Sequence, residues 1–278
     1  MLTSLPLPPE LYDKIIDQLR DQSDALKSCS VVSKSWTPRS RHHLFSTIRF
    51  GSDLGVVAWQ NKFSDACNPP AHHARTLLVR SVGVFPENPF SSLCNVTRLS
   101  LDVHPSDGQR PISFSQLHGF APSLKLFQMT FKALGLTEVL NLVCSFPLLD
   151  HLGLWGQPIP SDTKFAPATP SPTFSGSLCL MVPPVMRIVA NQLISLPGGI
   201  NFRELVLPWF AELSATEDLI SACSHSLESL HLLSGVSRTY PFGTFLFFFP
   251  NLVSSYFFFL SLFVRRRQRH SDQHFFSN

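Results

Sequence analysis

The sequence predicts an α/β protein in which three short helices precede a row of repeating strand–helix units. Three observations support this. Apolar residues recur at helical spacing within the first fifty residues. A six-residue apolar pattern then recurs along residues 74–232. The 23 prolines among 278 residues favour many short elements over a few long helices. At this length, we expect one large domain or a small module joined to a larger one.

The charge of the chain is concentrated at its C-terminus. Residues 265–278 hold four arginines and one aspartate, which together give +3. The net charge of the whole chain is also +3, so residues 1–264 sum to zero. A body without net charge has no electrostatic footprint for nucleic acid. We therefore expect no nucleic-acid partner.

The first fifty residues predict three helices. In the first, Leu11, Ile15 and Leu19 recur every four residues. The second repeats the pattern at Ala25, Cys29, Val32 and Trp36, and Pro38 opens a third helix that runs to about residue 44. Three helices this short bury too little apolar surface to be stable alone. Either they cap a larger domain, or a partner completes their apolar surface.

Short motifs follow one another in a fixed order through this segment. They are Leu7-Pro8, Glu10-Leu11, Ile15-Ile16 and Leu19, then Leu26, Cys29, the stretch VVSKSW that ends at Trp36, and RHHLF that ends at Phe45. In this order they resemble the F-box family. The resemblance covers residues 4–48, and the polar linker 20–28 departs from the usual family pattern.

The resemblance implies a binding function. F-box motifs dock on a Skp-type adaptor, which joins them to a cullin–RING ubiquitin ligase. Carried over to this chain, the adaptor-binding residues are Leu7, Pro8, Leu11, Ile15, Ile16, Leu19, Leu26, Val31 and Trp36. Some of these side chains must be internal to the helical module, and the sequence does not separate the two groups.

The repeated pattern is L-x-x-L-x-L, with other apolar residues allowed. It begins at Ala74, Val96, Leu124, Leu149, Phe202 and Leu227, at intervals of 22, 28, 25, 53 and 25 residues. The interval of 53 is close to two units and predicts a further unit near 175. There, SGSLCL begins at Ser175, with Leu178 and Leu180 in register. The completed intervals fall within the 20–29 residues of leucine-rich repeats.

Helical patterns at 137–146, 186–196 and 214–226 lie between these strands. We therefore expect an irregular leucine-rich-repeat solenoid of about seven strand–helix units over residues 74–240, after a helical connector at 49–73. An α/β enzyme would use longer β-branched strands and larger units. The Pro/Ser-rich stretch 156–174 is expected to be a protruding insertion.

A target protein would bind at the exposed positions between the repeat leucines. These positions include Arg98, Ser100, Glu204, Val206, Ser229 and His231. The alternative is that they are an ordinary solvated strand face.

The sequence offers little support for catalysis. It contains no phosphate-binding glycine loop, no H-E-x-x-H and no G-x-S-x-G. The adjacent pairs His42-His43 and His72-His73 point in diverging directions on a helix or strand and do not readily share a metal. We therefore expect a non-enzyme without metal or other cofactor. The six cysteines are far apart and no secretory signal is evident, which indicates a reduced, cytoplasmic or nuclear protein.

The C-terminal 38 residues, 241–278, differ from the body. Residues 242–264 contain no charge, and residues 242–278 hold 11 of the 25 phenylalanines. By length this stretch could cross a bilayer. Phe, Leu, Ser and Pro codons are pyrimidine-rich, however, so we expect a misread or truncated terminus outside the fold. Two functional hypotheses follow. One is a substrate receptor that binds adaptor, cullin and an unknown target, and the alternative is an interaction scaffold anchored to a membrane by residues 242–264.

Overall fold

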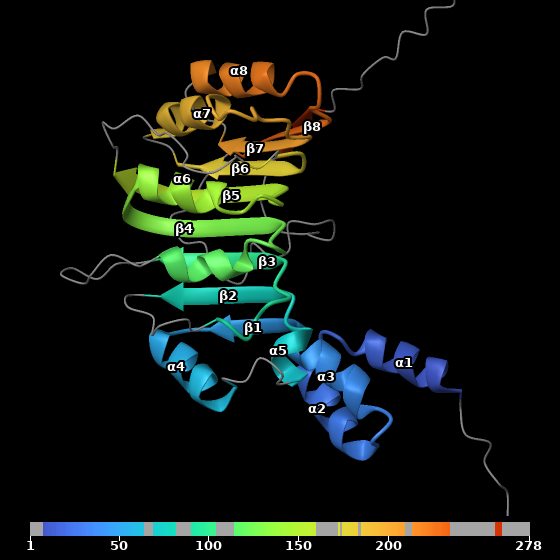
Figure 1. Ribbon diagram of the computed structural model, residues 1–278. Helices are drawn as coiled ribbons and strands as arrows, with labels where there is room; N and C mark the ends of the chain where they lie inside the picture. Colours follow the sequence, from blue (N-terminus) through green and yellow to red (C-terminus); the bar gives the residue numbers. More distant parts are fainter. Residues whose placement is uncertain are drawn as a thin grey trace, which may run out of the picture.

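The structure is a computed structural model, and it describes residues 8–63, 69–81, 90–103, 114–159, 172, 174–182, 185–208, 213–233 and 259–262. In this part the chain is a mixed α/β protein built on one sheet (Figure 1). A group of three short helices lies beside the first strand, at the lower right of the view. From there the strands are stacked upward in the view, and the last helix of the described chain lies at the top.

The three N-terminal helices are α1 (Pro9–Gln18), α2 (Ser23–Val32) and α3 (Thr37–Ser46). α1 and α3 lie where the sequence predicts them. The second helix is shorter than predicted, because α2 ends at Val32 and Trp36 lies just before α3, and Val32 is 67% exposed rather than on the apolar face. Prolines stand in the first turns of α1 and α3, where the missing N–H removes no helical hydrogen bond. α2 and α3 pack closely, whereas α1 contacts the group mainly through α3. These helices form the helical module of the protein.

The sheet follows the chain strand by strand. Its strands are β1 (Thr47–Phe50), β2 (Thr76–Ser81), β3 (Arg98–Val103), β4 (Leu126–Gly135), β5 (His151–Ile159), β6 (Ser177–Met181), β7 (Glu204–Pro208), β8 (Ser229–Leu233) and β9 (Phe259–Leu262). β1 to β8 pair in parallel, and β9 pairs antiparallel to β8. Each parallel strand must therefore be reached by a crossover from the one before it.

The crossovers carry the remaining helices. They are α4 (Asp53–Lys62), α5 (Pro69–His73), the 3₁₀ helix η1 (Phe114–Phe120), α6 (Leu136–Cys144), α7 (Met186–Ile194) and α8 (Leu213–Ala222). In Figure 1, α6 lies in front of the strands, and α7 and α8 lie at the top of the view, above β7. α6 to α8 occupy the three stretches in which the sequence predicts helices.

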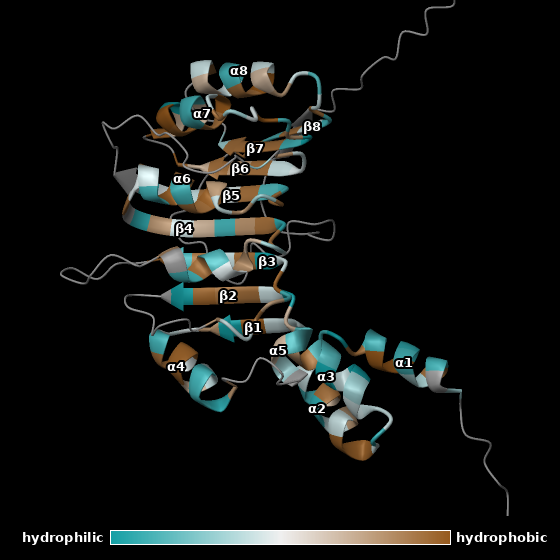
Figure 2. Ribbon diagram, in the orientation of Figure 1, coloured by the Kyte–Doolittle hydropathy of each residue, from teal (hydrophilic) through white to brown (hydrophobic). Residues whose placement is uncertain are grey.

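Side chains point alternately to the two faces of each strand, and those on one face form the core. The register aligns one apolar residue from each strand in a row across the sheet, and every member from β2 to β7 is buried: Leu77, Leu99, Phe127, Leu152, Leu178 and Leu205. The next such row runs from Val79 to Leu207. Figure 2 shows long brown, hydrophobic segments in β2, β6 and β7. Because the helices cover this face, a single core extends along the sheet.

The strand predicted near residue 175 is β6, and Leu178 pairs with Leu152 and Leu205 on its two sides. The residue that precedes β6 in the core differs from the prediction. Phe174, rather than Ser175, fills the buried position before the strand. Phe174 stacks on Phe202 with ring centroids 5.1 Å apart. Ser175 is exposed.

The sheet also begins earlier than the sequence predicts. β1 lies within the stretch expected to hold the end of the helical module and a helical connector, and it adds an eighth parallel strand to the seven expected units. Only Ile48 and Phe50 are buried in β1, a signal too short for the period to be recognised. Residues 49–73 also contain α4 and α5.

The C-terminal stretch was expected to lie outside the fold, yet four of its residues form β9. The rest of 241–278, and with it most of the proposed membrane segment 242–264, lies outside the described residues. None of the helices in the described ranges is long and apolar enough to cross a membrane.

Candidate docking surfaces

The helical module exposes apolar side chains on two of its helices. On α1, Leu11 and Ile15 are 42% and 48% exposed, and on α2, Val31 and Val32 are 83% and 67% exposed. Single exposed apolar residues are common in any protein. Here four of them lie on two helices of ten residues each, two on α1 and two on α2. We call Leu11, Ile15, Val31 and Val32 the module surface.

The structure separates the predicted adaptor-binding residues into two groups. Ile16 and Leu26 are at most 1% exposed and form the interior of the module with Cys29, so they are not available to a partner. Pro8, Leu11, Ile15 and Val31 are exposed, whereas Leu19 and Trp36 are half-buried. Leu7 lies outside the described residues.

Trp36 holds the two sides of the module together. Its ring lies against Tyr12 of α1, with centroids 5.5 Å apart. Thr37, the next residue, donates a hydrogen bond from Oγ1 to the carbonyl of Ser30 at 2.8 Å, which ties the start of α3 to the last turn of α2. These contacts make the half-buried Trp36 part of the frame that positions the module surface.

A charged cluster fixes α1 on α3. Arg39 donates from Nε and Nη2 to the two carboxylate oxygens of Asp17, at 2.6 Å each, and His43 Nε2 lies 2.7 Å from Asp17 Oδ1. The hydrogen bonds from Arg39, and next those from His43, hold the pKa of Asp17 well below its usual value. Because bidentate pairs are directional, this cluster sets the orientation of α1 and hence of Leu11 and Ile15.

A second surface lies on the face of the sheet opposite the core row. Four of the predicted target-binding residues meet there on adjacent strands, since the register pairs Glu204 with Ser229 and Val206 with His231. His231 Nε2 lies 3.2 Å from Glu204 Oε1 and 2.7 Å from Ser229 Oγ. The other two predicted residues, Arg98 and Ser100, lie on β3 and belong to a different part of the sheet.

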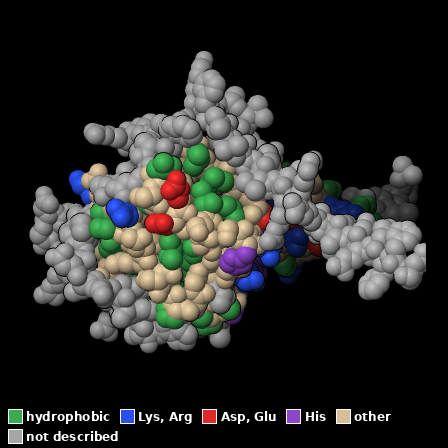
Figure 3. All heavy atoms as spheres, turned by 90° about the horizontal axis from the view of Figure 1, so that it is seen from above, with side chains coloured by type: hydrophobic (Ala, Val, Ile, Leu, Met, Phe, Trp, Pro, Cys, Tyr) green, Lys and Arg blue, Asp and Glu red, His purple; other side chains and the backbone are tan. Residues whose placement is uncertain are grey.

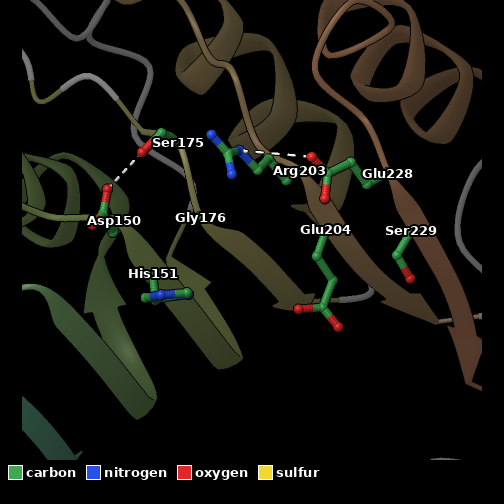
Figure 4. A pocket seen from close by; sticks show the side chains of 8 residues that line it. All are labelled: Asp150, His151, Ser175, Gly176, Arg203, Glu204, Glu228 and Ser229. Atoms are coloured by element: carbon green, nitrogen blue, oxygen red, sulfur yellow. Dashed lines mark hydrogen bonds and ion pairs between the residues drawn. The ribbon is translucent and has the colours of Figure 1, made fainter.

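A groove of about 440 Å³ opens at the starts of β5 to β8 (Figure 4). Its walls are Asp150, His151, Ser175, Gly176, Arg203, Glu204, Glu228 and Ser229. Ser175 Oγ donates to Asp150 Oδ1 at 2.6 Å, and Arg203 Nε lies 3.9 Å from Glu228 Oε1. The groove is polar, and three of its side chains are carboxylic acids. It therefore suits a positively charged group rather than an apolar one.

Six groove residues were not among the predicted site residues, namely Asp150, His151, Ser175, Gly176, Arg203 and Glu228. Asp150, Gly176, Arg203 and Glu228 occupy the second position of the repeated hexapeptide. This position looks like an unconstrained spacer in the sequence. In the sheet it is the residue directly before the first residue of each strand, so members from successive units stand side by side.

Two observations concern catalysis. Within the described ranges, no group of three or more His, Cys, Asp or Glu side chains could hold a metal ion. Burial, followed by the Glu204 carboxylate, raises the pKa of the Cys179 thiol to about 12. A thiol with this pKa is not a nucleophile at neutral pH.

The two histidine pairs noted in the sequence, His42-His43 and His72-His73, contact each other in the structure through His42 and His73. The ring centroid of His42 on α3 is 5.5 Å from that of His73 on α5 and 5.4 Å from that of His43. The sequence gives no sign of this contact, because it depends on how α3 and α5 pack.

Comparisons with protein-family models, with curated proteins and with solved structures found no significant match for this chain.

Proposed function

We propose that this chain is the substrate-receptor subunit of a cullin–RING ubiquitin ligase. In this proposal residues 4–48 are an F-box that docks on a Skp-type adaptor, and the stacked strand–helix units are degenerate leucine-rich repeats that bind a protein target. The chain itself catalyses nothing. It raises the concentration of its target near the ubiquitin-transferring subunits.

The observation that carries the proposal is the module surface. Leu11, Ile15, Val31 and Val32 project from α1 and α2 into solvent, next to an interior of only a few buried side chains. Covering apolar area contributes about 25 cal/mol per Å², so a partner that buries these side chains gains affinity and stabilises the module. The motif order from Leu7-Pro8 to Trp36 resembles that of the F-box, and this resemblance supports a Skp-type adaptor as the partner.

The arrangement of the sheet supports the second half of the proposal. Each of β2 to β8 starts 22 to 29 residues after the previous strand, and all of them pair in parallel, in chain order. Units that contact only their neighbours create a long continuous surface, which repeat proteins use to bind other proteins. Glu204, Val206, Ser229 and His231 lie on such a surface.

The test is binding of the full chain to a purified Skp-type adaptor, measured by isothermal titration calorimetry. We expect binding at micromolar concentration or tighter. Leu11→Asp and Val31→Asp should each weaken it at least tenfold, because a charge at the module surface loses its hydration in the complex. If the unmodified chain does not bind the adaptor at micromolar concentration, the proposal is wrong.

The control is Leu213→Asp, which places the same charge at a residue of α8 that is 71% exposed. It should bind the adaptor like the unmodified chain. Circular dichroism melts of all variants show whether the helices remain folded. If Leu213→Asp reduced binding as strongly as Leu11→Asp, the effect would be general and the module surface would not be the docking site.

A further inference from the structure

The starts of the parallel strands line one edge of the sheet. The arrows in Figure 1 point to the left, so these starts lie along the right-hand side of the view. We define the strand-start edge as the residue directly before each strand together with the first residue of that strand. In the repeated hexapeptide these are the second and third positions.

Charge is divided unequally along this edge. At β2, β3 and β4 it carries Arg75, Arg98 and Lys125, all exposed, and no carboxylate. From β5 to β8 it carries Asp150, Glu204 and Glu228 against the single cation Arg203, a net charge of −2 with histidine neutral. One half of the edge is therefore basic, and the other half is acidic.

Within the described residues these charges have few charged partners, although Glu204 Oε1 lies 3.2 Å from His231 Nε2 and Asp150 accepts a hydrogen bond from Ser175. Arg75 donates to the uncharged carbonyl of Asn95 at 3.2 Å, and among the described residues Arg98 and Lys125 form no ion pair. In the acidic half, the link between Arg203 and Glu228 is long, at 3.9 Å, and both side chains are at least 65% exposed. An exposed pair of this kind contributes little, so both groups remain available to a partner.

The groove lies in the acidic half. Figure 4 shows Asp150 on one side of it and Glu204 and Glu228 on the other. An open, polar space between carboxylates accommodates a lysine or arginine side chain. A nucleic acid does not fit the whole edge, because its phosphates would be repelled by this half.

We propose that the strand-start edge binds an extended segment of a protein partner, with acidic side chains over Arg75 and Arg98 and basic side chains in the groove between Asp150, Glu204 and Glu228. This inference rests on the proposed function only in one respect, namely that the bound segment belongs to the target protein. Binding of the segment to the edge requires no adaptor. Opposite charges at the two ends also fix the direction in which the segment lies.

The sheet sets the spacing of the segment. From the middle of β2 and β3 to the centre of the groove, midway between β5 and β8, there are four strand-to-strand steps of about 4.8 Å, or about 19 Å in all. An extended chain advances about 3.3 Å per residue. The acidic and basic pairs of the partner should therefore lie about six residues apart.

The test uses labelled twelve-residue peptides and the full chain, with binding measured by fluorescence anisotropy in 50 mM salt. One peptide has two aspartates and two arginines separated by a Gly/Ser spacer, and a second has the same blocks in reverse order. A third has the same composition with the charges alternating. We expect one of the blocked peptides to bind at least fivefold more tightly than the alternating one, with the difference shrinking at higher salt. Equal binding of all three would overturn the proposal.

Paired variants locate the site. Arg75→Gln with Arg98→Gln, and separately Glu204→Gln with Glu228→Gln, should each reduce binding of the blocked peptide about fivefold or more. Lys132→Gln with Glu217→Gln removes exposed charges elsewhere and should leave binding unchanged. If either edge pair leaves binding unchanged, the proposal is wrong. Leu11→Asp should still bind the peptide, so failure here is distinguishable from failure of adaptor docking.

Discussion

At the scale of single residues, the contact between His42 and His73 couples the helical module to the rest of the chain. His42 belongs to α3 and His73 to α5, the short helix just before β2. Burial is the main cause that lowers the pKa of both rings. The neighbouring positive groups add to it: His43, His73, Arg39 and Arg75 around His42, and His72 and Arg75 around His73.

These histidines predict a loss of stability in mild acid. Each has a lower pKa in the folded state than its ordinary value of 6.5, so the unfolded chain binds more protons as the pH falls below that value. The stabilisation is therefore present above about pH 6.5 and decreases as the pH falls through the lower folded pKa values. We expect the melting temperature to be lower at pH 5 than at pH 7.5 from this source.

The measurement is thermal melting of the full chain and of His42→Gln across this pH range. The variant should lose part of the pH dependence, whereas the exposed His118→Gln should keep all of it. Asp17 does not affect this comparison between pH 5 and pH 7.5. Its pKa is lowered from 3.8 in the folded state, so its contribution to the free energy of unfolding decreases only below about pH 4. A His42→Gln melt with the same pH dependence as the unmodified chain would contradict the prediction.

At the scale of elements, the strands differ in how completely their side chains are buried. In the inner strand β7, Leu205 and Leu207 are fully buried. In β8, at the end of the parallel array, the equivalent residues Leu230 and Leu232 are only partly buried and pack against the edge of the core. Figure 3 looks onto this end and shows hydrophobic side chains open to view among polar ones.

This difference predicts unequal costs for the same substitution. Leu205→Ala removes a buried side chain and leaves a cavity between neighbouring strands, so we expect a loss of about 2–5 kcal/mol in the free energy of unfolding. Leu230→Ala should cost less than half of that, because the side chain is already partly hydrated. Urea denaturation of the two variants measures both values. Equal losses would mean that the end of the array is as well packed as its middle.

The sequence predicts elements well where the apolar period is long. The strands from β2 to β7 each contribute two or more buried residues to the hexapeptide pattern, and in β8 the pattern is apolar but only partly buried. α6, α7 and α8 have long amphipathic stretches, so all of these elements were predicted. β1 was missed because two buried side chains make no period. The sequence did not predict that Phe174, rather than Ser175, fills the buried position before β6. The spacing of the repeat leucines allows a shift of one residue where a loop enters a strand.

The two surfaces were less predictable, each for its own reason. Ile15 and Ile16 are adjacent and equally apolar, yet one is 48% exposed and the other is buried, and only the packing of α1 on α3 decides between them. Asp150, Arg203 and Glu228 lie at spacer positions of the hexapeptide and become neighbours only when the strands align in parallel. Glu204, Val206, Ser229 and His231 could be predicted, because alternation places them opposite the core row.

At the scale of the whole molecule, the helical module and the sheet have separate interiors. The main core runs from Ile48 in β1 to Cys223 after α8, and it does not include the buried residues Ile16, Leu26 and Cys29 of the module. Figure 1 shows α1 projecting away from the sheet. Small interiors supply little stability, so the module should open without unfolding the sheet.

Hydrogen exchange measured by mass spectrometry tests this separation on the free chain. Amides of α1 and α2 should exchange faster than those of β3 to β7, whose hydrogen bonds are surrounded by the main core, by about tenfold or more. Leu205→Ala should accelerate exchange in the strands and leave α1 and α2 nearly unchanged, whereas Leu26→Ala should do the reverse. If both variants accelerated exchange equally in every element, the two interiors would form one cooperative unit. The module would then be held by the sheet rather than by its own few buried side chains and the Asp17–Arg39 pair.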